Sequence, residues 1–83
     1  MFGLTKYLAT TCGKFGIRVN SLSPGGIFDY QEKQFVKNYI KKVPLGRMAT
    51  WTDYNGSILF LASDASNYMT GSNLIIDGGW TAW

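Results

Sequence analysis

The sequence has no histidine, a single cysteine and few charged residues. Cys12 is the only thiol among 83 residues, and Lys, Arg, Asp and Glu together make up 16% of the chain. A lone cysteine forms no internal disulfide, and without histidine the chain offers neither a Cys/His zinc site nor a Ser-His or Cys-His nucleophile. The net charge of +3 is mild and predicts no nucleic-acid partner by itself.

Long hydrophobic runs are also missing. The longest unbroken apolar stretch covers residues 58–62, whereas a membrane-spanning helix needs about 20 apolar residues. Thr5 and Lys6 interrupt the beginning of the chain, where a signal peptide needs a continuous apolar segment. Together with the single thiol, these absences predict a soluble protein of a reducing compartment, the cytoplasm, with no membrane partner.

Hydrophobic and aromatic residues, by contrast, are plentiful. They account for 46% and 16% of the chain, which favours a folded domain over intrinsic disorder. A chain of 83 residues forms at most one domain and buries only about 60% of the surface that its unfolded form exposes. So small an interior has little room for five Phe, five Tyr and three Trp, and we expect some of them to face a partner.

Residues 17–27 form the stretch around which the chain is organised, and residues 17–23 are its strand-like part. Gly16 before it, Pro24 after it and the β-branched Ile17 and Val19 favour a buried strand, although periodicity alone also fits a fragment of a core helix. The strand runs directly into a Pro-Gly-Gly break. Such a break brings backbone groups, with few side chains in the way, to the edge of a sheet, where binding sites begin.

A first helix is predicted over residues 1–12, ahead of this strand. Apolar residues recur there at helical spacing: Met1, Leu4, Leu8 and Cys12. No capping residue precedes them, and Gly16 is placed to end the helix in a left-handed conformation.

A second, amphipathic helix is predicted over residues 28–43. Its apolar face consists of Phe35, Val36, Tyr39, Ile40 and Val43, and another face carries Lys33, Lys37 and Lys41. The lysines fit a solvated face or an anion-binding patch, and we favour the solvated face because functional surface stripes are rare. Asp29 and Lys33 have the spacing of a supporting ion pair.

A third helix begins at the capping-box pattern of Thr50 and Asp53. Trp51, Tyr54, Ile58 and Leu61 line one side of it, and further apolar residues cover the others. A helix that is apolar all round should be covered from two directions. Gly56 in its middle suggests either close approach of another backbone or a tolerated neutral glycine.

A second strand, Asn73–Ile76 with Asp77 after it, ends at Gly78 and Gly79. No helix is predicted after these glycines, so they lack the amide cradle of a phosphate-binding loop. The order helix, strand, helix, helix, strand is typical of the closing part of an α/β fold with a doubly wound parallel sheet.

The motifs then identify a family. The chain resembles the C-terminal portion of a classical short-chain dehydrogenase/reductase, a Rossmann-like fold, over essentially all of residues 1–83. The resemblance is carried by LTKYLA at residues 4–9, GIRVN at 16–20, PGGI at 24–27, PLGRM at 44–48, FLASDAS at 60–66, TG at 70–71 and DGG at 77–79. It implies that the chain is the C-terminal part of one NAD(P)-binding domain.

The resemblance also implies that the main catalytic parts lie elsewhere. In that family the glycine-rich cofactor loop, the residue that reads the adenosine ribose, and the catalytic Ser, Tyr and Lys all precede this region. Lys6 and Tyr7 do not replace the Tyr-x-x-x-Lys pair, because adjacent residues point to different faces of a helix. We therefore expect no catalytic residue in this chain and no turnover by the chain alone.

The part of the site that the resemblance assigns to this chain holds the nicotinamide of NAD or NADP. The expected cofactor-binding residues are Pro24, Gly25, Gly26, Ile27 and Asp29. Ile27 is expected to bond the carboxamide, while Asp29 stands where the family often has Thr and puts a negative charge near the cofactor phosphates. A plain turn without a ligand role is the alternative.

The resemblance further implies a substrate pocket and an oligomer. The expected substrate-binding residues are Phe28, Tyr30, Phe35 and Tyr39, with simple packing as the alternative for each. The substrate would be a small alcohol or carbonyl compound. Residues 51–61 and Asn73–Ile76 correspond to elements that pair subunits, so a homo-oligomer is expected.

Two functions follow from different classes. In the first, the chain belongs to an NAD(P)-dependent oxidoreductase and supplies the nicotinamide edge, the substrate-covering helix and the oligomer surface. In the second, it is a non-catalytic binding or assembly module that docks on a full-length relative.

Overall fold

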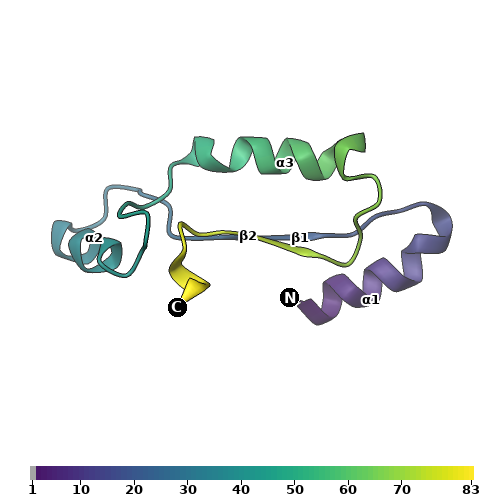
Figure 1. Cartoon of the computed structure of the whole chain (residues 1–83), viewed down its shortest axis with the longest axis horizontal. Helices are drawn as coiled ribbons and strands as arrows, with labels where there is room; N and C mark the ends of the chain where they lie inside the picture. The colour runs from purple at the N-terminus through teal and green to yellow at the C-terminus, as the bar shows by residue number, and fades with distance from the viewer. Residues whose placement is uncertain (1) are drawn as a thin grey trace.

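A computed structural model describes residues 2–83, and its elements follow the order that the sequence predicts (Figure 1). The helices and strands are α1 (Phe2–Cys12), β1 (Ser21–Pro24), α2 (Lys33–Ile40), α3 (Asn55–Ala62) and β2 (Asn73–Ile76). Short 3-10 turns are η1 (Gly13–Phe15), η2 (Trp51–Tyr54), η3 (Asp64–Ser66) and η4 (Trp80–Ala82). Met1, which the spacing placed in the first helix, lies outside the described residues.

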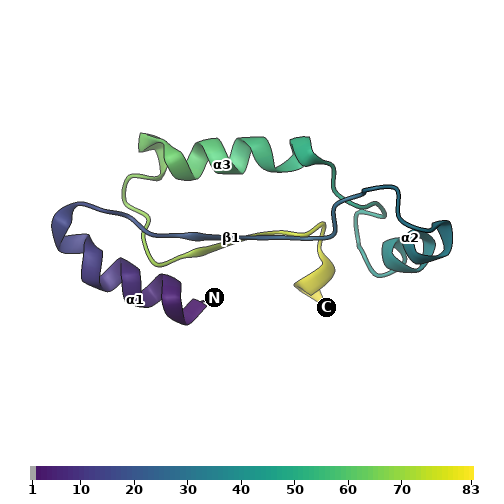
Figure 2. The same ribbon diagram turned by 180° about the vertical axis from the view of Figure 1, so that it is seen from behind.

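The two strands pair in parallel, as predicted. Ser21 lies opposite Asn73, and Pro24 lies opposite Ile76. Helices α1 and α3 lie on opposite sides of the strands in both ribbon views, and α2 lies beyond their carboxyl ends (Figures 1 and 2). Gly16 ends the first helical segment with φ 75°, the left-handed stop that the sequence predicts.

The first strand is shorter than the predicted residues 17–23. Pairing begins only at Ser21. Before it, Val19 donates its N–H to the Thr70 hydroxyl at 3.0 Å and accepts from the Gly71 N–H at 2.8 Å. A side chain therefore takes the place of a neighbouring strand here, which is why the regular ladder starts late.

The second helix is also shorter than predicted. It covers Lys33–Ile40 instead of residues 28–43. Residues 28–32 form a loop in which Tyr30 has φ 56°, outside the helical region for an L-residue. Because Asp29 lies in this loop, the predicted helical pair of Asp29 with Lys33 does not form on a helix.

The third helical segment begins after Thr50 as predicted, but its first turn is the 3-10 turn η2, and α3 itself begins at Asn55. It is also not covered as predicted. Thr50 donates its N–H to the Asp53 carboxylate at 2.7 Å, which confirms the capping box. Nothing approaches within 4 Å of the Cβ position at Gly56, so the neutral interpretation of this glycine holds within the described residues. Ile58 and Leu59 are 53% and 70% exposed, so the described chain leaves much of α3 bare.

Arg18 ties α3 to the segment before β1. Its guanidinium donates to the carbonyl oxygens of Leu61, Ser63, Ser66 and Met69 and to the Ser66 hydroxyl, at 2.8–3.3 Å. The carbonyls at the end of a helix have no partner within it, and a cation also complements the helix dipole there. Arg18 thus satisfies the end of α3 and the turn after it.

The interior of the chain is thin. Among the described residues the buried apolar side chains are Ala9, Val43, Met48 and Tyr54, and none is less than 2% exposed. The radius of gyration is 15.4 Å, against about 12 Å for a compact domain of this length. None of the described helices is both long and apolar enough to cross a membrane.

We predict that Arg18→Met lowers the free energy of unfolding by about 2 kcal/mol, because it leaves partly buried carbonyls without donors. Lys37→Met, at an exposed site of α2, is the control and should change stability by less than about 0.5 kcal/mol. Urea titration followed by circular dichroism measures both. Equal effects of the two substitutions would contradict the role of Arg18.

Candidate functional site

The glycine breaks after the two strands meet at one edge of the sheet. Gly25 donates its N–H to the Ile76 carbonyl at 2.9 Å, which continues the ladder past β1. A Cβ placed on Gly25 would lie 2.8 Å from the Cα of Asp77. Glycine is required at this position because the two backbones touch.

Gly26 makes a similar contact with α2. Its N–H donates to the Tyr39 hydroxyl at 2.6 Å, and a Cβ there would lie 2.5 Å from the Tyr39 ring. The Tyr39 ring also stacks on Trp80, with centroids 4.5 Å apart. Tyr39 therefore joins the turn after β1, helix α2 and the C-terminal segment.

The predicted substrate-binding aromatics fall into two pairs. Phe35 and Tyr39 stack along α2 at 6.2 Å, and Phe28 and Tyr30 meet in the loop at 5.1 Å. Tyr30 is 89% exposed. The structure therefore brings Tyr39 to the glycine turn and leaves Tyr30 on the surface.

A small hollow of about 130 Å³ lies at this edge of the sheet. Of the predicted site residues, Gly25, Gly26 and Tyr39 line it, while Pro24, Phe28, Asp29, Tyr30 and Phe35 do not, and neither does Ile27. Residues that sequence reasoning did not assign to the site complete the wall: Leu45, Arg47, Ala49, Asp53, Tyr54, Ile76, Asp77 and Gly78.

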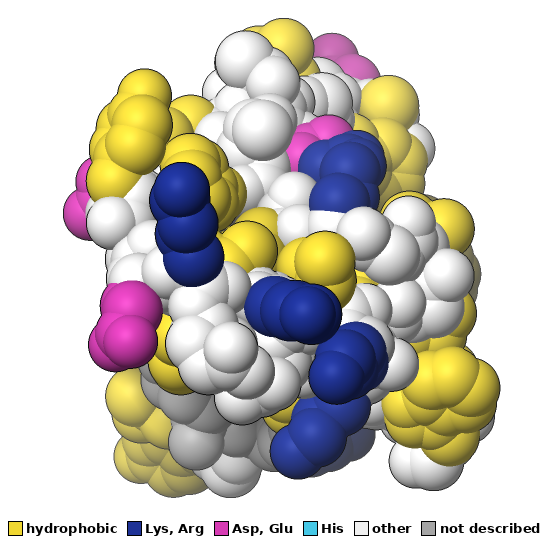
Figure 3. Space-filling model, turned by 90° about the vertical axis from the view of Figure 1, so that its left-hand side faces the viewer, with side chains coloured by type: hydrophobic (Ala, Val, Ile, Leu, Met, Phe, Trp, Pro, Cys, Tyr) yellow, Lys and Arg dark blue, Asp and Glu magenta, His cyan; other side chains and the backbone are white. Residues whose placement is uncertain are grey.

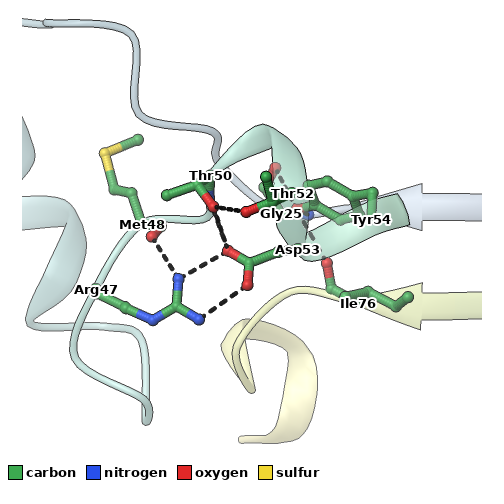
Figure 4. Close-up of polar contacts among 8 residues, drawn as sticks. All are labelled: Gly25, Arg47, Met48, Thr50, Thr52, Asp53, Tyr54 and Ile76. Atoms are coloured by element: carbon green, nitrogen blue, oxygen red, sulfur yellow. Dashed lines mark hydrogen bonds and ion pairs between the residues drawn. The ribbon is translucent and has the colours of Figure 1, made fainter. Parts of the chain in front are cut away.

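An ion pair closes one side of the hollow (Figure 4). The Arg47 guanidinium donates to both oxygens of Asp53, at 2.8 and 3.0 Å, and to the Met48 carbonyl. Hydrogen bonds from Arg47 and from the Thr50 N–H hold the pKa of the Asp53 carboxyl well below its usual value. The capping-box pattern was the sequence signal for Asp53, but nothing in the sequence paired it with Arg47.

Tyr54 joins the ends of the two strands. Its hydroxyl accepts from the Gly25 N–H at 3.1 Å and lies 3.3 Å from the Ile76 carbonyl, to which it can donate. The side chain is 5% exposed. Its position on the apolar side of the third helix predicted burial but gave no sign of this polar contact.

After the second strand, backbone N–H groups of the glycine turn are already bonded to a side chain of the same segment. The Asp77 carboxylate accepts from the Thr81 hydroxyl at 2.7 Å and from the N–H groups of Gly79 and Thr81, and these bonds lower its pKa. Only a 3-10 turn of three residues, Trp80–Ala82, follows. The N–H groups that would face a phosphate are thus already bonded to a carboxylate.

Ile27 lies between two backbone bonds. The Ala49 N–H donates to the Gly26 carbonyl and the Phe28 N–H donates to the Ala49 carbonyl, each at 2.8 Å. The carbonyl of Ile27 accepts from the side-chain amide of Gln31 at 3.0 Å. In the same loop the Asp29 N–H donates to Gln31 Oε1 at 2.8 Å, while the Asp29 side chain is exposed.

The lysines of the predicted second helix lie on the surface, two of them on α2 and Lys41 just after it. Lys33, Lys37 and Lys41 are all exposed, and the space-filling view of this end shows Lys and Arg side chains among hydrophobic ones (Figure 3). Within residues 2–83 no cluster of three or more Cys, Asp or Glu side chains could hold a metal ion.

Comparison with known proteins identifies the family. The family model for enoyl-(acyl carrier protein) reductase matches residues 1–81. The chain belongs to this family of short-chain dehydrogenases/reductases.

Named relatives agree with this assignment. The chain is 42% identical over 88 residues to D-arabinitol 2-dehydrogenase [ribulose-forming] of Candida tropicalis, a match that covers 96% of this chain and 31% of that protein. A short-chain dehydrogenase from Leptospira borgpetersenii, solved with bound NAD+, is 54% identical with a TM-score of 0.94, over 96% of this chain and 32% of that one.

A gluconate 5-dehydrogenase from Burkholderia cenocepacia, solved with NADP and tartrate, is 31% identical with a TM-score of 0.93. That match covers 99% of this chain and 34% of the other. This short-chain dehydrogenase/reductase chain therefore spans about a third of the length of its relatives. The neighbours' shared architecture confirms the Rossmann-like parallel sheet predicted from the sequence.

We predict that Gly26→Ala displaces Tyr39 and destabilises the chain by about 1–3 kcal/mol through overpacking. Gly56→Ala is the matched control, because its Cβ meets nothing within 4 Å and alanine favours a helix by about 1 kcal/mol. Urea unfolding gives both values. In a Tyr39→Ala background the cost of Gly26→Ala should largely disappear, and an unchanged cost would show that Tyr39 is not the obstacle.

We predict that Asp53 makes stability depend on pH below about 4, the unfolded pKa of an Asp. Because the folded pKa is lowered, this contribution is complete above the unfolded value and is lost as the pH falls towards the folded one. Asp53→Asn should reduce the fall in unfolding free energy over that acid range, whereas Glu32→Gln, outside this network, should not. Urea titrations at a series of pH values test this, and an unaltered slope in Asp53→Asn would refute it.

Proposed function

We propose that this chain is part of an NAD(P)-dependent oxidoreductase of the short-chain dehydrogenase/reductase type, which acts on a small alcohol or carbonyl compound. Its contribution would be the edge that faces the nicotinamide, the substrate-covering helix α2 and an oligomer surface. The family assignment supports this, as do relatives named as dehydrogenases and neighbours solved with NAD+ or NADP.

The observation that carries the proposal is the hydrogen bond at the Ile27 carbonyl. This carbonyl accepts an N–H from the primary amide of Gln31 at 3.0 Å. Nicotinamide bears the same functional group, so the residues present fit a bound nicotinamide carboxamide. When bound, the nicotinamide ring supplies hydride transfer.

The neighbouring residues would hold the edge in shape. Gly25 keeps the turn against Asp77, and Gly26 is fixed by the Tyr39 hydroxyl. Pro24 closes β1 just before these glycines. Asp29, with its exposed carboxylate, would set the charge that the cofactor phosphates meet.

Helix α2 and its loop would border the substrate. Tyr39 lies on the hollow beside the glycine turn, and Phe35 stacks against it. Phe28 and Tyr30 sit together in the exposed loop before the helix, where they would close over a bound substrate. An alcohol or carbonyl compound of small size suits a pocket with aromatic walls.

The exposed apolar residues of residues 51–61 and Asn73–Ile76 would pair subunits. Trp51 and Leu59 are each 70% exposed, and Ile75 on β2 is 51% exposed. Bare apolar surface of this kind is typical of an interface. We propose that a second copy of the protein covers it and that the protein is cytoplasmic.

A second candidate function is a non-catalytic assembly module that docks on a full-length relative. The thin interior favours it, because a chain with four buried apolar side chains gains little stability alone. The sequence also contains no Tyr-x-x-x-Lys, the pair that the family uses as proton donor and orienter. We expect no turnover by the chain alone in either case.

A chimera separates the two functions. When this chain replaces the matched third of the Leptospira short-chain dehydrogenase, the folded chimera should bind NAD+ within about tenfold of the parent, as measured by calorimetry. The parent lacking that third is the control and should not bind. A folded chimera without NAD+ binding would refute the nicotinamide edge, and tight NADH binding by the isolated chain would contradict its being only one part of the site.

A further inference from the structure

Gln31 uses both ends of its side-chain amide inside one loop. Its Nε2 donates to the Ile27 carbonyl at 3.0 Å, and its Oε1 accepts from the Asp29 N–H at 2.8 Å. The side chain is half-buried although its neighbours on both sides are exposed. A primary carboxamide thus donates to one backbone group and accepts from another two residues away.

The Ile27 carbonyl is presented by the backbone on either side of it. The bonds from Ala49 engage the Gly26 carbonyl and the Phe28 N–H, the groups that flank Ile27. Ile27 and Ala49 form an isolated parallel bridge, and backbone groups along an extended chain alternate in direction. The carbonyl of Ile27 therefore points away from Ala49, to the side where Gln31 reaches it.

The same contacts hold an unfavourable backbone. Tyr30 has φ 56°. It lies in the chain between Gln31 and the two residues that Gln31 bonds, Ile27 and Asp29. Side chains rarely adopt this conformation without support from their surroundings. When Gln31 leaves Ile27 and Asp29, the loop loses the two bonds that close it around Tyr30.

We propose that Gln31 is an internal competitor of the nicotinamide carboxamide for the Ile27 carbonyl. The inference rests on the proposed function, because it takes Ile27 as the residue that meets the carboxamide. Gln31 and the cofactor bring the same kind of N–H donor to the side of this carbonyl that faces away from Ala49, and in this proposal the Gln31 amide leaves that side when the cofactor amide bonds there. This release frees the Asp29 N–H and loosens the loop that carries Phe28 and Tyr30, which couples cofactor binding to movement of the substrate side.

The test uses the ¹⁵N-labelled chimera with the Leptospira short-chain dehydrogenase, titrated with NADH, because this chain by itself is expected to supply only one part of the cofactor site. Gln31→Met keeps the length and removes both polar ends. Gln34→Met is the matched control, since the Gln34 amide bonds only the exposed Asn38 side chain on the same helix. We expect the Ile27 signal to reach half-saturation at a NADH concentration about three- to tenfold lower in Gln31→Met than in the wild type, and no change in Gln34→Met. In the wild type, hydrogen exchange at the Asp29 N–H should become faster as NADH is added.

The outcomes distinguish this inference from the function on which it rests. If NADH moves the Ile27 signal in every chain but Gln31→Met binds equally or more weakly, Gln31 supports the loop and does not compete. Unchanged or slower exchange at Asp29 would overturn the inference in the same way, with the nicotinamide edge intact. If NADH moves the Ile27 signal in no chain, the nicotinamide edge itself fails and the competition fails with it.

Discussion

The contact between the backbones of Gly25 and Asp77 is the constraint on which this structure depends. Parallel strands bring their carboxyl ends to one edge of the sheet, and here the backbone segments that leave the two strands touch each other. Tyr54 spans the contact with its hydroxyl, which bonds groups from both strand ends. The hollow lies around this point. The ion pair of Arg47 with Asp53 and the Tyr39 side chain of α2 line it.

The sequence predicts the parts of the fold that are decided locally. Helical spacing, the left-handed Gly16, the capping box and the second strand depend on residues close together in the chain, and the structure has all of them. The errors in length arise where distant or unusual partners take over. The Val19 N–H donates to the Thr70 hydroxyl, more than fifty residues away, in place of a strand partner. The side chain of Gln31 closes a loop where a helix was expected.

The candidate site was predictable only in outline. The glycines after each strand indicate that something approaches closely, and the resemblance points to a cofactor. In the structure a residue of the chain itself approaches each of these glycines: Asp77 for Gly25, Tyr39 for Gly26, Val43 for Gly78 and Pro44 for Gly79. The hydrogen bonds of Arg18 and Tyr54 had no local signal in the sequence, because their partners come from segments that only the fold brings near.

The register of the two strands also determines how their outer edges behave. The backbone N–H groups of Ser21 and Gly25 point towards β2. Backbone groups alternate in direction along a strand, so those of the even-numbered residues between them point away from β2, and Pro24 is one of these residues. Proline has no N–H, and β1 therefore offers an incomplete row of donors at its carboxyl end to any strand that adds alongside. For this chain by itself, an incoming strand would be held mainly near Leu22, which makes edge-to-edge aggregation on that side less favourable where the glycine turn begins.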